Sequence, residues 1–394
     1  MSGALSWPFL RLYLLVLLYF SANAILNVII PLQGESLGAT NTAIGIIMGA
    51  YLFTTMFIRP WAGQVIQKHG PIKVLHFILI VNGFALLLYT FTGLGGYLIA
   101  RMLQGVCTAF FSMALQIGII DALPEEDRSQ GISLYSLFSY IPGIIGPLLA
   151  VGIWQGNMDY FTVVMIAIAL FTGIVGYSAK VEKGESKSLA NKDSQGINTL
   201  KSYSQLVKNP HLFKCSVLML VASIVFGAIT TFIPLYAMQL QEGNAGVYLM
   251  LQAGTVVFAR FTLRKKIPSD GKWHSSFIML TMFILALAAQ SVSFAVTGGA
   301  LFFYIAAILM GIAQAIIYPT LTTYLSFVLP QPNRNVLLGL FIAMADLGVS
   351  LGSVIMGPMA DIFSYSFMYM ICAILGVLMV FFAYDPRKTC VGKA

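Results

Sequence analysis

Residues 98–131 read LIARMLQGVCTAFFSMALQIGIIDALPEEDRSQG. An apolar helix carries Arg101 and Gln104 near its start and ends at Asp121, and the charged turn Leu123–Arg128 follows at once. In water this would be an ordinary buried helix with a polar exit. In a bilayer, an arginine inside a spanning helix costs about 2.5–3.5 kcal/mol on insertion scales, so such a residue usually has a function. The solvent around the helix therefore decides its interpretation.

The composition indicates lipid. Of 394 residues, 58% are hydrophobic and 9% are charged, whereas soluble domains carry about 25% charged residues. Mean hydropathy is +0.86. Such a chain cannot cover itself with a polar surface, which predicts an all-α integral membrane protein. The apolar run 9–31 is too long for a signal-peptide core and has no cleavage site after it, so we interpret it as the first span.

Apolar runs of about 20 residues indicate membrane spans. Every second loop between these runs lacks Lys and Arg, whereas the other loops carry the basic residues behind the net charge of +8. The positive-inside rule then predicts a multi-pass protein of the cytoplasmic membrane with both termini inside. Because the basic charge follows topology, we expect no nucleic-acid partner. The twelve predicted spans are 9–31, 42–62, 73–92, 97–120, 131–154, 160–178, 212–236, 244–262, 275–296, 300–325, 336–357 and 366–384.

The two halves of the chain repeat. We therefore predict two pseudo-symmetric six-helix bundles, 1–178 and 211–394, joined by a polar cytoplasmic linker at 179–210. In transporters built from parallel halves, the substrate site lies near the midplane between them. The matches at an offset of 206 are Gly105 with Gly311, Leu123 with Leu329 and Arg128 with Arg334, those at 201 are Gly45 with Gly246 and Arg59 with Arg260, and the match at 203 is Pro31 with Pro234.

Three motifs resemble those of the major facilitator superfamily. They are Gly63-x4-Lys68-x-Gly70-x2-Lys73, with Gln67 in place of the usual acidic residue, Arg101-x2-Gln104-Gly105, and Pro142-Gly143-x2-Gly146-Pro147. Longer runs, such as RMLQGVCTAFFSMALQIGIIDALPEE, are similar to exporters of opine-type metallophores within that superfamily. The resemblance implies twelve transmembrane helices in the major facilitator fold, working by alternating access. It also implies efflux of a small, metal-free metallophore in exchange for protons, which would support metal acquisition.

Two charged residues inside spans are the main candidates for substrate binding or proton coupling. Arg101 shares a helix face with Gln104, but it could instead snorkel to the headgroups, since it lies about one turn inside the span. Asp346 lies near the middle of span 336–357. A desolvated carboxylate there suits proton loading and release, although a structural ion pair is the alternative.

Other polar residues in the spans should face a wet cavity or a neighbouring helix, because an unsatisfied polar group in hydrocarbon costs several kcal/mol. The substrate-site candidates among them are Asn23, Asn27, Gln116, Gln314 and Tyr318, and we interpret Gln116 and Gln314 as near-equivalents in the repeat. A cytoplasmic charge cluster that favours one gate state would comprise Arg59, Lys68, Lys73, Asp121, Arg128, Arg260 and Arg334.

The charges also bear on the substrate. Cationic drugs usually require an acidic residue in the cavity, and the first six spans offer none away from their ends, so Arg101 favours an anionic or zwitterionic acid. A proton-coupled multidrug or sugar efflux pump remains the alternative. An intramembrane enzyme or sensor is disfavoured because no HExxH and no paired intramembrane aspartate occurs. The four histidines and four cysteines lack metal-ligand spacing, so we expect no metal site, no cofactor and a monomer in the lipid bilayer.

Overall fold

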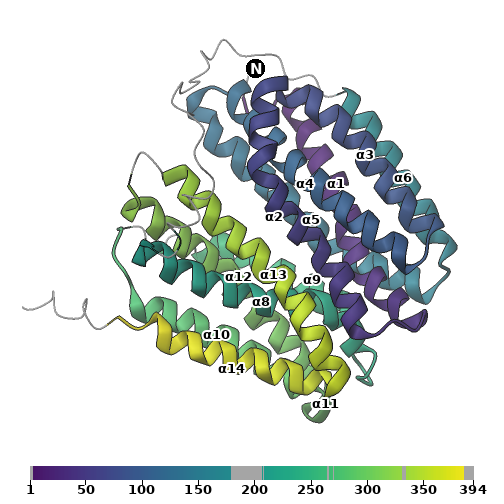
Figure 1. Ribbon diagram of the computed structural model, residues 1–394, viewed down its shortest axis with the longest axis vertical. Coiled ribbons are helices and arrows are strands. Elements are labelled where there is room, and N and C mark those ends of the chain that lie inside the picture. Colours follow the sequence, from purple (N-terminus) through teal and green to yellow (C-terminus); the bar gives the residue numbers. More distant parts are fainter. Residues whose placement is uncertain are drawn as a thin grey trace, which may run out of the picture. The chain divides into compact units, whose positions relative to one another are not determined.

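The computed structural model describes residues 3–178, 206, 208–263, 266–268, 270–330 and 334–385. Its described secondary structure is helical (Figure 1). Twelve of these helices are long and apolar enough to cross a bilayer, which confirms the predicted all-α membrane architecture. The predicted linker 179–210 lies almost wholly outside the described residues, and so do Lys180, Arg264, Lys265 and Cys390.

The chain divides into two compact units, Met1–Ala190 with Ala245–Met250, and Asn191–Asn244 with Leu251–Ala394. We call them unit 1 and unit 2. The helices of unit 1 are α1 (Trp7–Ser36), α2 (Asn41–His69), α3 (Pro71–Phe91), α4 (Leu94–Ala122), α5 (Glu125–Gln155) and α6 (Asp159–Ser178). Then follow α8 (Pro210–Ala237), α9 (Ala245–Leu263), α10 (Ser275–Ser293), the single turn α11 (Ala295–Gly298), α12 (Ala300–Val328), α13 (Arg334–Ile362) and α14 (Tyr365–Ala383).

Proline, glycine and polar caps set the ends of these helices. Pro71 and Pro210 lie at first helical positions, where the missing N–H has no partner to lose. Gly70 ends α2 with φ +83°, a conformation that glycine adopts at little cost, and α3 begins at the next residue. The Thr40 side chain accepts a hydrogen bond from the Ala43 N–H at 3.2 Å. The expected charged turn is shorter than predicted, because α5 already begins at Glu125.

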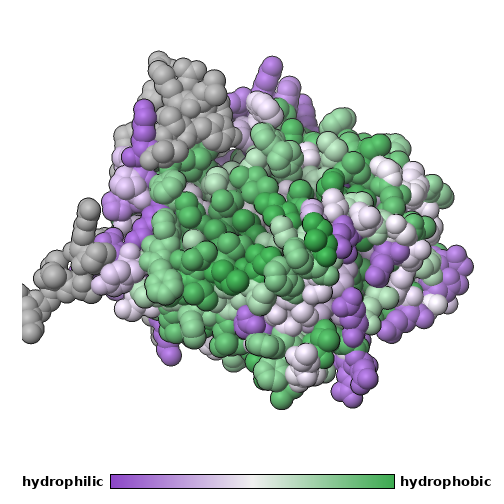
Figure 2. Space-filling model, turned by 60° about the horizontal axis from the view of Figure 1, so that its bottom comes forward, coloured by the Kyte–Doolittle hydropathy of each residue, from purple (hydrophilic) through white to green (hydrophobic). Residues whose placement is uncertain are grey.

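The outside of the protein is apolar. Large side chains such as Phe91, Phe258 and Leu301 are exposed on the helices. Figure 2 shows hydrophobic residues covering a broad, continuous part of the visible face, with hydrophilic residues toward its margins. A soluble monomer rarely exposes so large an apolar surface, whereas lipid tails solvate it. The chain is therefore a multi-pass membrane protein.

The duplication is visible in the helix packing. A side chain at Gly105 of α4 would overlap the Tyr51 carbonyl oxygen and the Thr54 side chain of α2. A side chain at Gly311 of α12 would meet the corresponding groups of α9, the Gln252 carbonyl oxygen at 2.6 Å and the Thr255 side chain at 2.7 Å. The repeat offsets of 206 and 201 thus relate two equivalent helix contacts. Small residues permit such close approach in membranes.

A seam of glycines joins α8 to α13. At Gly227 a side chain would overlap the Val349 carbonyl, and at Gly352 it would overlap the Ile224 carbonyl. The repeat-related contact in unit 1 joins α1 to α5 between Ala24 and Gly146. Only unit 2 therefore has a glycine on both sides of this contact. We refer to Gly227, Gly348 and Gly352 as the α8–α13 seam.

Candidate functional site

Arg101 lies in the second turn of α4, and its side chain is completely buried, with 0% exposed. An arginine that snorkels to the headgroups keeps its guanidinium in the polar interface. Arg101 instead directs its guanidinium to residues of α1 and α2, so the snorkelling interpretation is wrong. The side chain belongs to the interior of unit 1.

Two amides of α1 hold the guanidinium. Arg101 donates from Nη1 to Asn23 Oδ1 at 2.6 Å and from Nη2 to Asn27 Oδ1 at 2.9 Å. Asn23 and Asn27 are four residues apart, so they share one face of α1. From α2, Met48 Sδ lies 3.4 Å from Nη2, and the Tyr51 ring centroid lies 5.4 Å from Cζ. The structure thus brings three of the predicted candidates into contact.

The guanidinium has no carboxylate partner among the described residues. Its hydrogen-bond partners there are Asn23, Asn27 and Met48, all of them neutral. Within the described chain, Arg101 Nε is also buried without a hydrogen-bond acceptor. A buried charge is costly unless it is paired. Unit 1 therefore contains a desolvated positive charge whose only described acceptors are neutral groups.

A second layer of polar contacts extends along the same face of α4. Gln104 Oε1 accepts a hydrogen bond from the Tyr89 hydroxyl of α3 at 2.7 Å. One turn further, Thr108 Oγ1 accepts from the Tyr51 hydroxyl at 3.0 Å and lies 2.9 Å from the Tyr19 hydroxyl. Tyr19, Tyr51, Tyr89 and Met48 were not among the residues predicted from the sequence. The signal that points to Tyr51 is Gly105, since the α4 glycine marks where α2 comes closest.

Unit 2 carries a hydrogen bond of the same length at the equivalent place. Gln252 Nε2 of α9 donates to Gln314 Oε1 of α12 at 3.0 Å. By the repeat offsets this pair corresponds to Tyr51 and Thr108. The predicted equivalence of Gln116 and Gln314 is therefore wrong, because the 206-residue offset relates Gln116 to Thr322 instead.

The remaining substrate and coupling candidates have different surroundings. Gln116 is half-buried on α4 and interacts with the Tyr135 hydroxyl of α5. Tyr318 packs near Phe341, with ring centroids 6.1 Å apart. Asp346 lies near the middle of α13 and is half-buried. Their roles stay predictions.

The predicted charge cluster is not joined by ion pairs between its described members. Arg128 Nε donates to the Leu123 carbonyl at 3.2 Å, and Arg334 Nη1 donates to the Ser326 carbonyl at 3.1 Å. Each arginine therefore caps the end of the preceding helix, α4 or α12. Lys68, Lys73 and Asp121 are exposed, whereas Arg59 and Arg260 are half-buried within α2 and in the last turn of α9. A part in gating stays a prediction.

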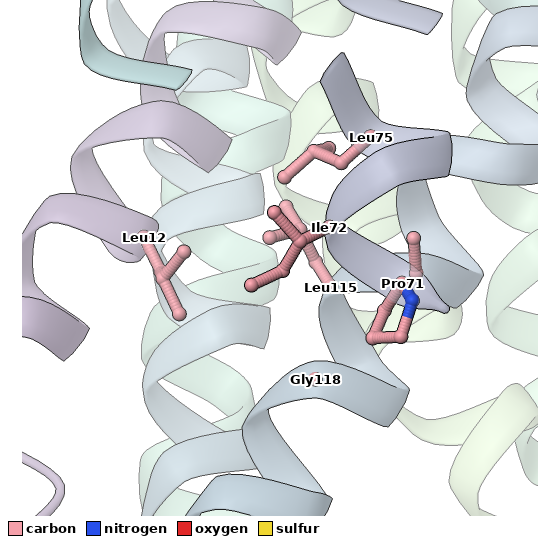
Figure 3. A pocket seen from close by; sticks show the side chains of 7 residues that line it. Leu12, Pro71, Ile72, Leu75, Leu115 and Gly118 are labelled. Carbon is pink, nitrogen blue, oxygen red and sulfur yellow. The ribbon is translucent and has the colours of Figure 1, made fainter. Parts of the chain in front are cut away.

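A small pocket of unit 1 lies away from these polar groups. Figure 3 shows Leu12 of α1, Ile72 of α3 and Leu115 of α4 around it. Its lining is completed by Pro71, Leu75, Ala114 and Gly118, so no polar side chain points to a ligand there. No group of three or more potential metal ligands is found within the described parts of the chain.

Comparison with known proteins relates this arrangement to transporters. Residues 12–267 and 269–390 match the family described as Major Facilitator Superfamily. Over 390 residues the chain is 55% identical to the staphylopine export protein of Staphylococcus aureus, which covers 99% of this chain and 98% of that protein. It is 23% identical over 367 residues to an uncharacterized MFS-type transporter of Methanocaldococcus jannaschii, covering 90% and 92%. The nucleoside transporter NupG has the same fold, with a TM-score of 0.79, 14% identity and coverage of 94% and 98%.

Proposed function

Because the chain belongs to the major facilitator superfamily, we propose that it exports a small carboxylate-bearing metallophore, similar to staphylopine and in its metal-free form. The 55% identity to a staphylopine export protein over nearly the full length supports this substrate class. The single structural observation that carries the proposal is the buried Arg101 guanidinium without a carboxylate partner among the described residues.

An anionic substrate fits this guanidinium. Its fork of N–H groups matches a carboxylate in a bidentate geometry, and charge-assisted hydrogen bonds are about twice as strong as neutral ones. Asn23 and Asn27 offer only neutral amide oxygens, so a carboxylate competes with them for the guanidinium. In this proposal the amides hold Arg101 in place until the substrate arrives, and Gln104 and Tyr89 add neutral hydrogen-bonding groups beside it.

We further propose that inward proton movement drives export. One elementary charge moving across 100 mV releases about 2.3 kcal/mol, so one or two protons per cycle would support accumulation outside. Asp346 is the proposed proton carrier, because it is a half-buried carboxylate near the middle of a membrane helix. The proposal places both termini in the cytoplasm and treats the protein as a monomer in the bilayer.

The first experiment measures the metallophore directly. We would delete the gene in a strain that makes an opine metallophore and measure the compound by mass spectrometry in cells and supernatant. Export predicts accumulation inside and depletion outside, restored by the wild-type gene. Unchanged extracellular metallophore together with raised drug sensitivity would favour the multidrug pump instead.

A reconstituted system separates transport from synthesis. Purified protein in proteoliposomes should move labelled metallophore across the membrane, faster when the receiving side is acidic. A matched cationic compound of similar size should not be transported. Equal transport of both compounds would show that Arg101 does not select for negative charge.

A further inference from the structure

The two units share one contact. In each, a basic side chain of the first helix donates a hydrogen bond to a backbone carbonyl at or just after the end of the last helix. Arg11 Nη1 of α1 donates to the Ser178 carbonyl of α6 at 3.4 Å. Lys214 Nζ of α8 donates to the carbonyl of Tyr384, just after α14, at 3.2 Å. These residues correspond by the repeat offsets of 203 and 206. The two contacts are therefore related by the duplication.

Both cations also lie against a tryptophan. Arg11 Cζ is 5.4 Å from the Trp7 ring centroid, and Lys214 Nζ is 4.6 Å from the Trp273 ring centroid. A cation over an indole face is attracted by the ring quadrupole. A cation at the C-terminal end of a helix is further stabilised by the helix dipole.

The two contacts differ in whether a described carboxylate lies beside the cation. Lys214 has the Asp385 carboxylate at 3.7 Å, and Trp273 is buried and donates from Nε1 to the Ala383 carbonyl at 3.1 Å. The residue that corresponds to Asp385 in the first half is Ala179. Among the described residues, the contacts of Arg11 are the Ser178 carbonyl and the Trp7 ring. The first-half contact thus has the cation and the aromatic ring but no carboxylate from the described chain.

The surroundings of Arg11 open to the outside of unit 1. Trp7 is 66% exposed and Tyr177 is 55% exposed. Tyr177 stacks on His76 of α3, with ring centroids 4.6 Å apart. Trp and Tyr at helix ends are typical of the membrane interface, where lipid headgroups lie. We call Trp7, Arg11 and Tyr177 the Arg11 patch. It lies where α1 begins and α6 ends.

We propose that the Arg11 patch binds the phosphate of an anionic phospholipid. The lipid phosphate takes the place at Arg11 that the Asp385 carboxylate takes at Lys214. The guanidinium N–H groups that have no acceptor among the described residues donate to phosphate oxygens, while Trp7 and Tyr177 lie against the glycerol and upper acyl region. Basic pockets between transmembrane helices recognise such headgroups.

Native mass spectrometry of the full-length protein tests the proposal. The probes are phosphatidylglycerol and phosphatidylcholine with identical acyl chains. We expect the wild-type protein to retain phosphatidylglycerol several-fold better than phosphatidylcholine. Arg11→Gln should lose this preference, Arg11→Lys should keep most of it, and the matched variant Lys214→Gln should leave it intact. An unchanged preference in Arg11→Gln would overturn the proposal.

A gain-of-binding variant keeps the proposal testable even if Arg11→Gln does not fold. Asp385→Ala removes the carboxylate from the second contact and should add one bound phosphatidylglycerol. Absence of that additional lipid would contradict the inferred exchange of carboxylate for phosphate. Glycerol 1-phosphate at millimolar concentration should not displace the lipid. Complete displacement would assign the patch to a soluble phosphate compound and overturn the lipid proposal.

Discussion

Helices α4 and α12 occupy equivalent places in the two units, yet they carry different side chains. Gly105 and Gly311 admit the same backbone contact, and the Tyr51–Thr108 and Gln252–Gln314 hydrogen bonds lie at matching positions. One helical turn before these glycines, the two helices no longer carry similar side chains. Arg101, Gln104 and Asn23 correspond to Ala307, Met310 and Phe226.

This difference distinguishes the helix contacts that both units share from the Arg101 network of unit 1. Glycines and a hydrogen bond between helices occur in both units because they set how the helices pack. The Arg101 network has apolar residues at the repeat-related positions of unit 2, so the shared packing does not require it. In membranes a buried charge is expensive, which supports the proposed role of Arg101 in substrate binding.

The largest expected effect follows from removing that charge. Arg101→Met should lower metallophore export about 100-fold in proteoliposomes, which corresponds to about 2.7 kcal/mol of lost substrate or transition-state binding. Its unfolding temperature should change little, because the cost of burying the charge is removed while the Asn23 and Asn27 amides lose their donor. Transport rate and unfolding temperature are measured on the same preparations.

The matched control is the repeat-related position. Ala307→Ser should change export less than twofold, since Ala307 has no charged role. Equal losses in both variants would break the comparison, because they would assign the effect to helix packing.

The next largest effect is a loss of stability at the helix contacts that both units share. Gly105→Ala and Gly311→Ala should each destabilise the protein by about 1–3 kcal/mol, because the new methyl group overlaps a backbone carbonyl of the facing helix. Thermal unfolding in detergent measures both. Gly83→Ala is the control, since nothing lies within 4 Å of a side chain there. A large loss in only one of the two variants would show that the contacts are not equivalent.

Asp346 tests whether unit 2 carries the coupling. Asp346→Asn should lower export driven by an imposed pH gradient about tenfold and leave substrate exchange without a gradient nearly unchanged. Its repeat-related residue is Tyr140, and Tyr140→Phe should keep the pH response. Unchanged pH-driven export in Asp346→Asn would exclude this carboxylate as the proton carrier.

The smallest effect concerns the hydrogen bonds between helices. Tyr51→Phe should cost about 0.5–1.5 kcal/mol of stability, the usual net value of one hydrogen bond. Gln252→Leu should cost a similar amount or less, because Gln252 Oε1 is already buried without a described partner. Double-mutant cycles with Thr108→Val and Gln314→Leu measure the two coupling energies. Clearly unequal couplings would mean that the duplicated contact has diverged.

The sequence predicted most of the fold because lipid imposes simple rules. Each of the twelve predicted spans falls on one membrane helix, with ends that differ by at most seven residues. The glycines matched at an offset of 206, Gly105 and Gly311, lie at the α2–α4 and α9–α12 contacts. Helix ends were less certain, because α2 and α5 continue beyond their apolar runs. Charged residues such as Lys68 and Glu126 lie on those extensions.

The site was predicted only in part. Arg101, Asn23 and Asn27 could be named because polar groups stand out in an apolar span. Met48 and Tyr89 could not, since both are common on lipid-facing and buried surfaces alike. Sequence spacing assigns residues to one face of a helix but does not say which helix that face meets. That is why the position of Arg101 inside the bundle required the structure.

The α8–α13 seam has a consequence for mutational tolerance. At Gly227, Gly348 and Gly352 even an added methyl group would meet a backbone carbonyl of the opposite helix. Every single-nucleotide missense change of a glycine codon adds at least that much volume. Random variation should therefore be purged along this line, while the lipid-facing sides of the same helices accept many apolar exchanges.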